Sequence, residues 1–265
     1  MPEGDTLYRT AAGLRPHLIG RVVTAARATR PGPQVERIVG SAITAVDTQG
    51  KNLLIRFDNG LVIRTHLRMN GSWHRYRPGE RWRRGEARAR LVIEVPGAVA
   101  VCFDAPVVEL FEERTEQLHP GLAPLGPDLL DPDWGPGQAE EALRRLRDPV
   151  RSAMTISEAL LDQRALAGIG NIWRNETLFA ERVDPFARVA DLDDATLTRL
   201  VATARRFLRT SAGVAPGRVP MAVYRRAGRP CRRCGTLLRS GPLSGELPRT
   251  TYWCPSCQPT MTTET

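Results

Sequence analysis

The chain has 265 residues, 42% of them hydrophobic, which is enough for one large domain or two modest domains with real cores. It has no apolar run of about 18 residues that could cross a membrane, and acidic Glu3 and Asp5 with no apolar segment behind them resemble no secretory signal, so we expect a cytoplasmic protein. The net charge of +9 favours a polyanionic partner such as nucleic acid, although a generally basic soluble protein would have the same composition.

The chain opens with Met1-Pro2-Glu3-Gly4. A start methionine before proline is normally removed, which leaves Pro2 as a secondary amine with a pKa near ~8 that is partly neutral at neutral pH. Attack of such an amine on a sugar C1′ or an aldehyde gives a cationic iminium, and the neighbouring Glu3 is a candidate general acid or base. The alternative is an ordered N-terminus that only caps the first helix.

The first helix is predicted over residues 5–18, with Gly20 as its stop. Its apolar positions at helical spacing are Leu7, Ala11, Leu14 and Leu18. Pro16 is expected to end or bend this helix early. Because the helix starts directly behind Pro2 and Glu3, its N–H groups and dipole would favour an anionic substrate there.

Short strands follow without intervening helices, which predicts an antiparallel sandwich between about residues 20 and 115. The clearest runs are 21–24, 53–57, 61–64, 90–95 and 99–103. Asp58-Asn59-Gly60 between two of these runs is a tight hairpin signal. Cys102 is interpreted as a buried strand residue and not as a site.

Lys51 is the only lysine among 38 basic residues, and it follows Gly50 at the mouth of a strand. Arginine does not release its proton in a protein, whereas an ammonium group shifts its pKa readily and exchanges protons. A single lysine in this background therefore indicates a position where a titratable proton or a compact charge matters. Chance survival of one lysine is the alternative.

Five prolines and three glycines within residues 118–136 indicate a linker. Helices are predicted after it at 138–147, 156–165, 172–182 and 191–210. Two of them are joined by Ala167-Gly168-Ile169-Gly170-Asn171, a turn whose backbone N–H groups could hold a phosphate. Asn171 is expected to cap the next helix, and a plain helix turn with an asparagine cap is the alternative.

The last section contains Cys231-x-x-Cys234 and Cys254-x-x-Cys257, separated by 19 residues. This spacing is typical of a structural zinc site in which four thiolates fill a tetrahedral ion, and a redox dithiol pair is the alternative. Residues 236–239 and 250–253 are predicted as the strands of a hairpin, with the turn at 240–245. Arg249 lies between this turn and the second strand, where it would reach a phosphate or remain solvated.

Together these features resemble the DNA glycosylases of the formamidopyrimidine-DNA glycosylase/endonuclease VIII family, and the resemblance covers nearly the whole chain. Several separate motifs in the same order are far more specific than any one of them. The matching motifs are Pro2-Glu3-Gly4, Gly50-Lys51, His66-Leu67-Arg68-Met69-Asn70-Gly71, Leu160-Leu161-Asp162-Gln163 through Gly168-Ile169-Gly170-Asn171, and the terminal cysteine finger with Arg249.

The resemblance implies a role for each matched residue. Pro2 would be the nucleophile that displaces a damaged base and forms a Schiff base, and Glu3 would protonate the deoxyribose as its ring opens. Lys51 would bind the phosphate beside the lesion and donate a proton during elimination. Asn171 and Arg249 would grip the flanking phosphates. The family assigns Arg249 to the second, δ, elimination, which the high pKa of arginine limits to charge stabilisation.

Further DNA contacts are implied in two loops. Met69 would be the wedge that fills the space left by an extruded base, with a core methionine as the alternative. Arg68 in the same loop, and Tyr224 and Arg225 where the chain leads into the finger, are candidate DNA-binding residues.

Two departures from the family bear on the substrate. Purine-specific members carry an Arg-Phe wedge after an Asp-Pro, and the aligned stretch here, Asp104-Ala105-Pro106-Val107-Val108, has neither. Those members also have a long loop that covers oxidised guanine, whereas here only residues 208–223 separate the last helix from Tyr224. Both absences favour oxidised pyrimidines. Asp5-Thr6 replaces a frequent Pro-Glu, which leaves open whether a second carboxylate assists.

We therefore expect an α+β protein. Its predicted parts are an N-terminal helix and antiparallel β-sandwich (1–117), a linker (118–136), a helical domain with a helix–two-turn–helix motif (137–217) and a zinc-finger hairpin (218–265). The expected function is a bifunctional DNA glycosylase/AP lyase with β,δ-elimination. One structural zinc ion, no other cofactor, damaged DNA as partner, no membrane and a monomer complete the expectation. The alternatives are 8-oxoguanine-type purine specificity and a non-catalytic damaged-DNA-binding zinc protein.

Overall fold

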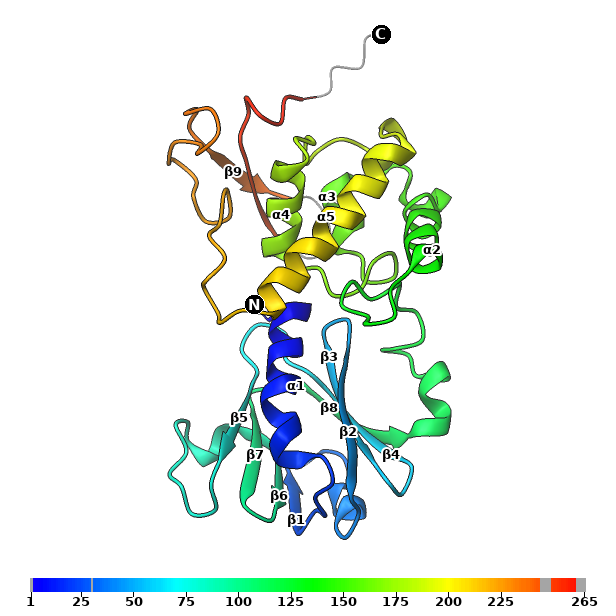
Figure 1. Cartoon of the computed structure of the whole chain (residues 1–265), viewed down its shortest axis with the longest axis vertical. Helices are drawn as coiled ribbons and strands as arrows, with labels where there is room; N and C mark the ends of the chain where they lie inside the picture. Colours follow the sequence, from blue (N-terminus) through cyan, green and yellow to red (C-terminus); the bar gives the residue numbers. More distant parts are fainter. Residues whose placement is uncertain (1, 30, 244–248, 261–265) are drawn as a thin grey trace. The chain divides into compact units, whose positions relative to one another are not determined.

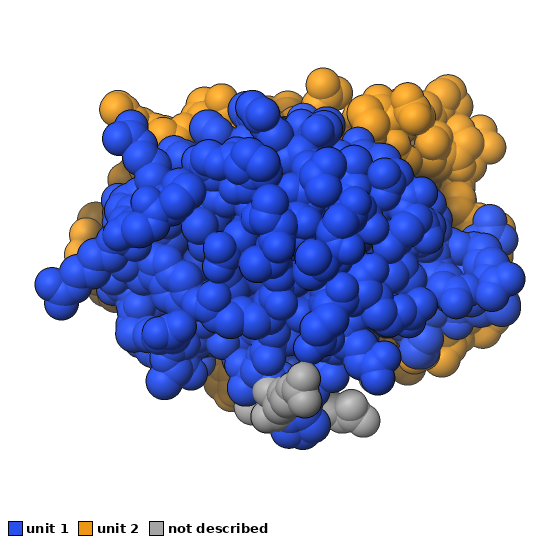
Figure 2. Space-filling view, turned by 90° about the horizontal axis from the view of Figure 1, so that it is seen from below, with its two compact units in different colours: residues 1–124 blue, residues 125–265 orange. Residues whose placement is uncertain are grey.

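The chain divides into two compact units, Met1–Pro124 and Leu125–Thr265, which Figure 2 colours separately. The structure, a computed structural model, describes residues 2–29, 31–243 and 249–260. The boundary between the units falls inside the proline-rich segment 118–136. Among the described residues, no helix combines the length and apolar character needed to span a membrane.

Unit 1 begins with helix α1, Gly4–Leu18, whose four predicted apolar positions are all buried. Pro16 does not end this helix early, because the helix continues to Leu18. It lies in the last turn, where its missing N–H removes only one helical hydrogen bond, and the N–H of Ile19 still donates to the Arg15 carbonyl at 3.1 Å. The helix stops before Gly20, which has a φ of +77°.

Two four-stranded antiparallel sheets form the rest of unit 1 (Figure 1). One sheet has the order β2 (Ile43–Gln49), β3 (Asn52–Phe57), β4 (Leu61–His66) and β8 (Val107–Glu112). The other has the order β1 (Ala25–Ala28), β6 (Ala89–Val95), β7 (Ala98–Phe103) and β5 (Ser72–Tyr76). A single hydrophobic core joins both sheets to the apolar stripe of α1, and the buried Cys102 belongs to it. The predicted sandwich is confirmed.

The predicted strand at 21–24 is wrong, because the first strand begins at Ala25. In the predicted stretch the chain passes from one sheet to the other. The N–H of Val23 donates to the Ser41 carbonyl, whereas the N–H of Thr24 donates to the Glu94 carbonyl on β6. A segment that changes sheets cannot form one continuous ladder, whatever its β-branched content. The hairpin at Asp58-Asn59-Gly60 is confirmed.

Unit 2 contains helices α2 (Pro136–Leu146), α3 (Ile156–Leu161), α4 (Asn171–Ala180) and α5 (Asp194–Ala212) and the strands β9 (Arg239–Pro242) and β10 (Thr250–Trp253). Helix α3 ends four residues before the predicted 165. The reason is Gln163, whose amide group donates to the carbonyls of Leu161 and Ile169 and accepts from the N–H of Gly168. These bonds build the turn between α3 and α4.

The start of unit 2 is packed against its helices. Leu129 and Leu130 are buried, and the N–H of Leu129 donates to the Ala167 carbonyl at 3.2 Å. The guanidinium of Arg205 on α5 donates to the Leu129 carbonyl at 2.6 Å. Residues 125–135 therefore carry fixed contacts in spite of their linker-like composition.

The first finger strand was predicted at 236–239, but β9 spans Arg239–Pro242 and pairs with β10. Thr236 and Leu238 instead bond the segment before them, with the N–H of Cys231 donating to the Thr236 carbonyl and the N–H of Leu238 to the Arg229 carbonyl. These bonds form the turn that carries the first cysteine pair. Strand β9 therefore starts only after this turn, at Arg239. Part of the predicted turn at 240–245 lies outside the described residues.

Candidate active site and nucleic-acid interface

Glu3 occupies the N-cap position of α1 in an extended conformation, with 1% of its surface exposed. Its carbonyl accepts the N–H groups of Thr6 at 3.0 Å and Leu7 at 3.2 Å, but its side chain makes no capping hydrogen bond. Half-buried Pro2 precedes it. A carboxylate buried without a capping role is unusual and argues against the view that these residues only start the helix.

Asp5, the other N-terminal acid, is engaged on its own helix. Its carboxylate lies 3.1 Å from the guanidinium of Arg9 one turn later, and its side chain is 7% exposed. An acidic residue in the first turn also stabilises the positive end of the helix dipole. These contacts explain Asp5 as part of the helix start.

Lys51 lies in the two-residue turn that joins β2 to β3, where Gly50 has a φ of +59°. The next residue, Asn52, pairs with His66 on β4. Burial, then the positive charges of Arg64, Lys51 and Arg68, lower the pKa of His66 to about 4. A neutral imidazole surrounded by three cations marks a locally electropositive site that would favour an anion.

The loop between β4 and β5 presents Met69 outward, with 56% of its surface exposed. Its base is fixed: Leu67 is buried and its carbonyl accepts the N–H of Gly71 at 2.9 Å. A Cβ at Gly71 would lie 2.7 Å from that carbonyl oxygen, so only glycine fits there. Arg68 is exposed and has a φ of +44°. The exposed Met69 is not a core methionine.

The beginning of α1, the β2–β3 turn and the β4–β5 loop lie at the same end of unit 1 (Figure 1). A surface hollow bordered by Arg37, Asn59 and Glu112 lies at the other end of β3 and contains none of the predicted site residues. Unit 1 thus gathers Pro2, Glu3, Lys51, Arg68 and Met69 at one end.

Helix α4 starts at Asn171, behind Gly168 with a φ of +96° and Gly170 in the N-cap position. The expectation that Asn171 caps this helix is wrong, because extended Gly170 takes that position and Asn171 is the first helical residue. The Asn171 amide instead donates to the carbonyl of Thr250 at 3.2 Å. It therefore links the helix start to the finger.

Two further residues of α4 bind the same strand. Arg174 is completely buried, and its guanidinium donates to the Thr250 carbonyl at 3.3 Å and the Thr251 hydroxyl at 3.1 Å. The Asn175 side-chain oxygen accepts the N–H of Tyr252 at 2.8 Å. These bonds fix β10 on α4. Half-buried Arg249 directly precedes β10, so it is held close to Asn171.

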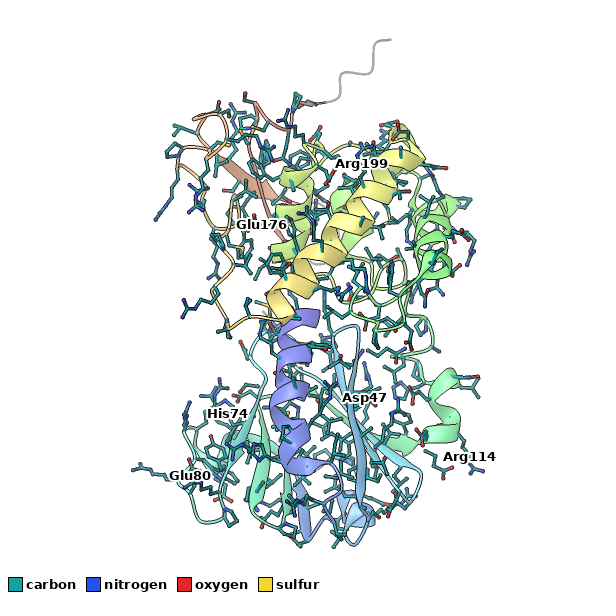
Figure 3. The ribbon with its side chains drawn as sticks, in the orientation of Figure 1. Asp47, His74, Glu80, Arg114, Glu176 and Arg199 are labelled. Carbon is teal, nitrogen blue, oxygen red and sulfur yellow. The ribbon has the colours of Figure 1, made fainter. Side chains whose placement is uncertain are left out.

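Glu176, labelled in Figure 3, holds the segment that leads into the finger. Its buried carboxylate accepts the N–H groups of Ala222 at 2.8 Å, Val223 at 3.0 Å and Tyr224 at 2.8 Å. The Tyr224 ring packs edge-on against Tyr252, with centroids 5.3 Å apart. Unit 2 therefore brings Asn171, Tyr224 and Arg249 together around α4.

Arg225 is exposed, with a φ of +56°, and its guanidinium lies 5.6 Å from the Tyr224 ring centroid. Sequence reasoning did not single out Arg174, Asn175 or Glu176. One signal in the sequence could have identified them. These three polar or charged residues lie in the middle of a helix that also contains the apolar Trp173, Leu178 and Phe179.

The four cysteines lie close together, with all their sulfur atoms within 4.8 Å of one another. Two pairs are 4.0 Å (Cys231–Cys257) and 3.5 Å (Cys234–Cys254) apart. A tetrahedral zinc ion with bonds of about 2.3 Å requires sulfur atoms about 3.8 Å apart, and a disulfide requires about 2.05 Å. The donor set and its spacing fit a zinc ion and do not fit disulfide pairs.

Two family models match the chain. The formamidopyrimidine-DNA glycosylase N-terminal domain matches residues 1–106, and the formamidopyrimidine-DNA glycosylase H2TH domain matches residues 125–219. Among curated proteins, the chain is 40% identical to a probable endonuclease 8 2 of Streptomyces coelicolor, over 97% of this chain and 94% of that protein. It is 30% identical to endonuclease 8 of Escherichia coli, over 97% and 100% of the two chains.

Solved structures show the same fold at lower sequence identity. A Lactococcus lactis Fpg in complex with DNA that contains N7-benzyl-Fapy-dG has a TM-score of 0.83 and 20% identity, covering 97% of this chain and 100% of that one. The same protein bound non-covalently to DNA with an AP site has a TM-score of 0.82 and 21% identity, with the same coverage.

Proposed function

Because the chain belongs to the formamidopyrimidine-DNA glycosylase family, we propose that it is a bifunctional DNA glycosylase/AP lyase of base-excision repair that removes oxidised pyrimidines. The observation that carries this proposal is the buried Glu3 carboxylate directly behind Pro2, at the end of unit 1 that also holds Lys51. The names of the curated relatives, endonuclease 8 and DNA-(apurinic or apyrimidinic site) lyase, support it.

The first step forms a bond between the Pro2 nitrogen and C1′ of the damaged nucleotide. The glycosidic bond breaks with its electron pair on the departing base. Glu3 then gives a proton to the ring oxygen as the deoxyribose opens, and the nitrogen lone pair forms the iminium after the amine proton has left.

The iminium then acts as an electron sink. It acidifies the C2′ hydrogen, whose loss expels the 3′ phosphate, and a second elimination expels the 5′ phosphate. A one-nucleotide gap with phosphate ends results. Lys51 binds the phosphate beside the lesion and moves a proton, whereas Arg249 stabilises the developing phosphate charge, because a guanidinium does not give up its proton.

The remaining candidates hold the DNA. Asn171, Tyr224 and Arg225 in unit 2 and Arg68 in unit 1 contact phosphates, which fixes the register without reading sequence. A base must leave the stack before its bond to the sugar can be cut. Exposed Met69 fills the vacated space, as apolar side chains do when they insert between bases.

Cys231, Cys234, Cys254 and Cys257 would hold one zinc ion. Four thiolates complete its tetrahedron and leave no position for water, so the ion would be structural and no other cofactor is needed. It would keep the hairpin that carries Arg249 folded. Both groups of site residues belong to one chain, which supports a monomer. A DNA substrate would place this monomer in the cytoplasm, on the nucleoid.

Two features support pyrimidine specificity. The stretch 104–108 lacks the Arg-Phe pair that the purine-specific members carry, and only residues 213–223 connect α5 to Tyr224. The nearest alternative is 8-oxoguanine-type specificity, and the other is a damage-binding protein without catalysis.

The test is excision from duplexes that contain dihydrouracil, thymine glycol or 8-oxoguanine opposite cytosine, followed by borohydride reduction. We expect cleavage and a covalent adduct with the two oxidised pyrimidines, and much slower reaction with 8-oxoguanine. Preference for 8-oxoguanine would contradict the proposed specificity for oxidised pyrimidines. Absence of any adduct with abasic DNA would contradict the proposal that the protein is an enzyme. A variant with a short blocked N-terminal extension provides the matched inactive control.

A further inference from the structure

Arg84 joins two loops of unit 1 that are distant in sequence. It lies between β5 and β6, and its Nη1 atom donates to the Asn70 carbonyl at 3.3 Å and to the Asp104 carboxylate at 2.5 Å. Asn70 follows Met69 in the β4–β5 loop, and Asp104 follows β7. The side chains of Arg84 and Asp104 are 30% and 20% exposed, so the bridge is only partly open to solvent.

Asp104 is itself held in place. The Nε and Nη2 atoms of Arg88 lie 2.9 Å and 2.8 Å from its two carboxylate oxygens, and its own N–H donates to the Arg88 carbonyl at 2.9 Å. Its φ of +52° is uncommon for a residue with a side chain and persists only when neighbouring contacts enforce it. Asp104 is therefore a fixed anchor for Arg84.

The Met69 loop has a fixed base and an exposed tip. Gly71 packs closely on Leu67 at the base, whereas Met69 and Asn70 are exposed. The bond from Arg84 to the Asn70 carbonyl is a contact that restrains the chain next to the wedge. An exposed apolar side chain inserts well only if its backbone is ordered beforehand, because ordering it during binding would cost conformational entropy.

We propose that Arg84, anchored by Asp104, is a positioning residue that holds the Met69 loop in the conformation that fills the vacated position in the duplex. This inference rests on the proposed function, in which Met69 is the wedge. The loop after β7 begins with Asp104, which anchors Arg84, and it lacks the Arg-Phe pair expected of purine-specific members.

The test compares Arg84→Ala with Arg84→Lys, and with Arg83→Ala as the matched control. Arg83 is an exposed neighbour whose hydrogen bond to the Tyr76 hydroxyl uses its backbone N–H, which alanine keeps. Two reactions are measured: excision of dihydrouracil from a duplex, which requires extrusion of the base, and cleavage of a preformed abasic site. Fluorescence of 2-aminopurine opposite the lesion reports insertion of the wedge.

We expect Arg84→Ala to slow dihydrouracil excision about tenfold and to reduce the 2-aminopurine signal, as loss of one hydrogen bond from a charged donor predicts. Cleavage of the abasic site should change less than about twofold, since no base has to leave the stack. Arg84→Lys should restore part of the excision rate. Arg83→Ala should match the wild type, and urea midpoints should show that all variants are folded.

A double-mutant cycle makes the test decisive. In a Met69→Ala background, Arg84→Ala should cause little further loss, because the residue to be positioned is already gone. An equal loss in both backgrounds, or a loss no larger than that of Arg83→Ala, would overturn the inference. If the wild type does not cleave abasic DNA at all, it is the proposed function that fails.

Discussion

At the scale of single residues, His66 gives a test of the electropositive site. Burial, and then the charges of Arg64, Lys51 and Arg68, lower its pKa from 6.5 to about 4. The unfolded chain therefore binds a proton more readily than the folded chain between these pH values. The resulting stability is present above pH 6.5 and is lost as the pH falls toward 4.

We expect His66→Asn to flatten this pH dependence. The free energy of unfolding of the wild type should fall by on the order of 1–2 kcal/mol more than that of the variant between pH 7 and pH 4.5. Urea unfolding at the two pH values measures the difference, and His17→Asn in the last turn of α1 is the control. Parallel losses in the wild type and His66→Asn would contradict the assigned environment.

Lys51→Arg keeps a positive charge in the β2–β3 turn and removes a proton that can be transferred. We expect DNA binding within about twofold of the wild type and cleavage of abasic DNA slower by about a hundredfold, the usual size of a general acid–base contribution. Single-turnover cleavage of an abasic site and a filter-binding assay separate the two effects. A fully active Lys51→Arg enzyme would show that charge alone is needed at this position.

The sequence predicted individual residues well where a motif is local. The cysteine spacing is the example, because the cluster of four sulfur atoms is confirmed. The function of the isolated lysine stays a prediction. Arg84, Arg174 and Glu176 were not predicted, because their partners are 14 to 77 positions away along the chain. No local pattern specifies such pairings. Only the fold brings the donor and the acceptor together.

At the scale of elements, Glu176 connects α4 to the segment before the finger. Glu176→Ala would leave three backbone N–H groups without their acceptor, and each of them is at least partly buried. We expect the free energy of unfolding to fall by about 3 kcal/mol. Urea unfolding measures this, with the exposed Glu140→Ala on α2 as control. A loss no larger than that of the control would contradict the structural role of the carboxylate.

The finger should depend on its metal. Purified protein should contain one zinc ion per chain, and Cys254→Ser should lose it together with DNA cleavage while the β-sandwich stays folded. Atomic absorption and circular dichroism test this. Cys102→Ala, a change in the sandwich core, should keep the zinc. A zinc-free protein with full cleavage activity would contradict the assigned function of the finger.

The bounds of an element were predictable from the sequence where its apolar residues form a regular buried stripe. Helices α1 and α5 follow their apolar periodicity to within three residues at each end. Strands β1 and β9 were misplaced, because one starts where the chain changes sheets and the other starts after the cysteine turn. In both places long-range hydrogen bonds, and not local propensity, decide the boundary.

At the scale of the whole molecule, the two units carry different parts of the proposed reaction. Unit 1 holds the amine, the carboxylate, the lysine and the proposed wedge at one end of the sandwich, where a common core fixes their elements. Unit 2 holds the proposed phosphate contacts on α4 and the finger. The net charge of +9 suits a DNA substrate and does not by itself indicate where the reaction occurs.

The central claim is that Pro2 is the nucleophile, and the composition makes this unusually testable. Once Met1 is removed, the chain has only two amines that can form a Schiff base, the N-terminal nitrogen and Lys51. The most direct measurement is borohydride reduction with abasic DNA, followed by digestion and mass spectrometry of the adduct. We predict that the sugar fragment is attached to the peptide that begins at Pro2, with the same result in Lys51→Arg. An adduct on Lys51 would contradict the account.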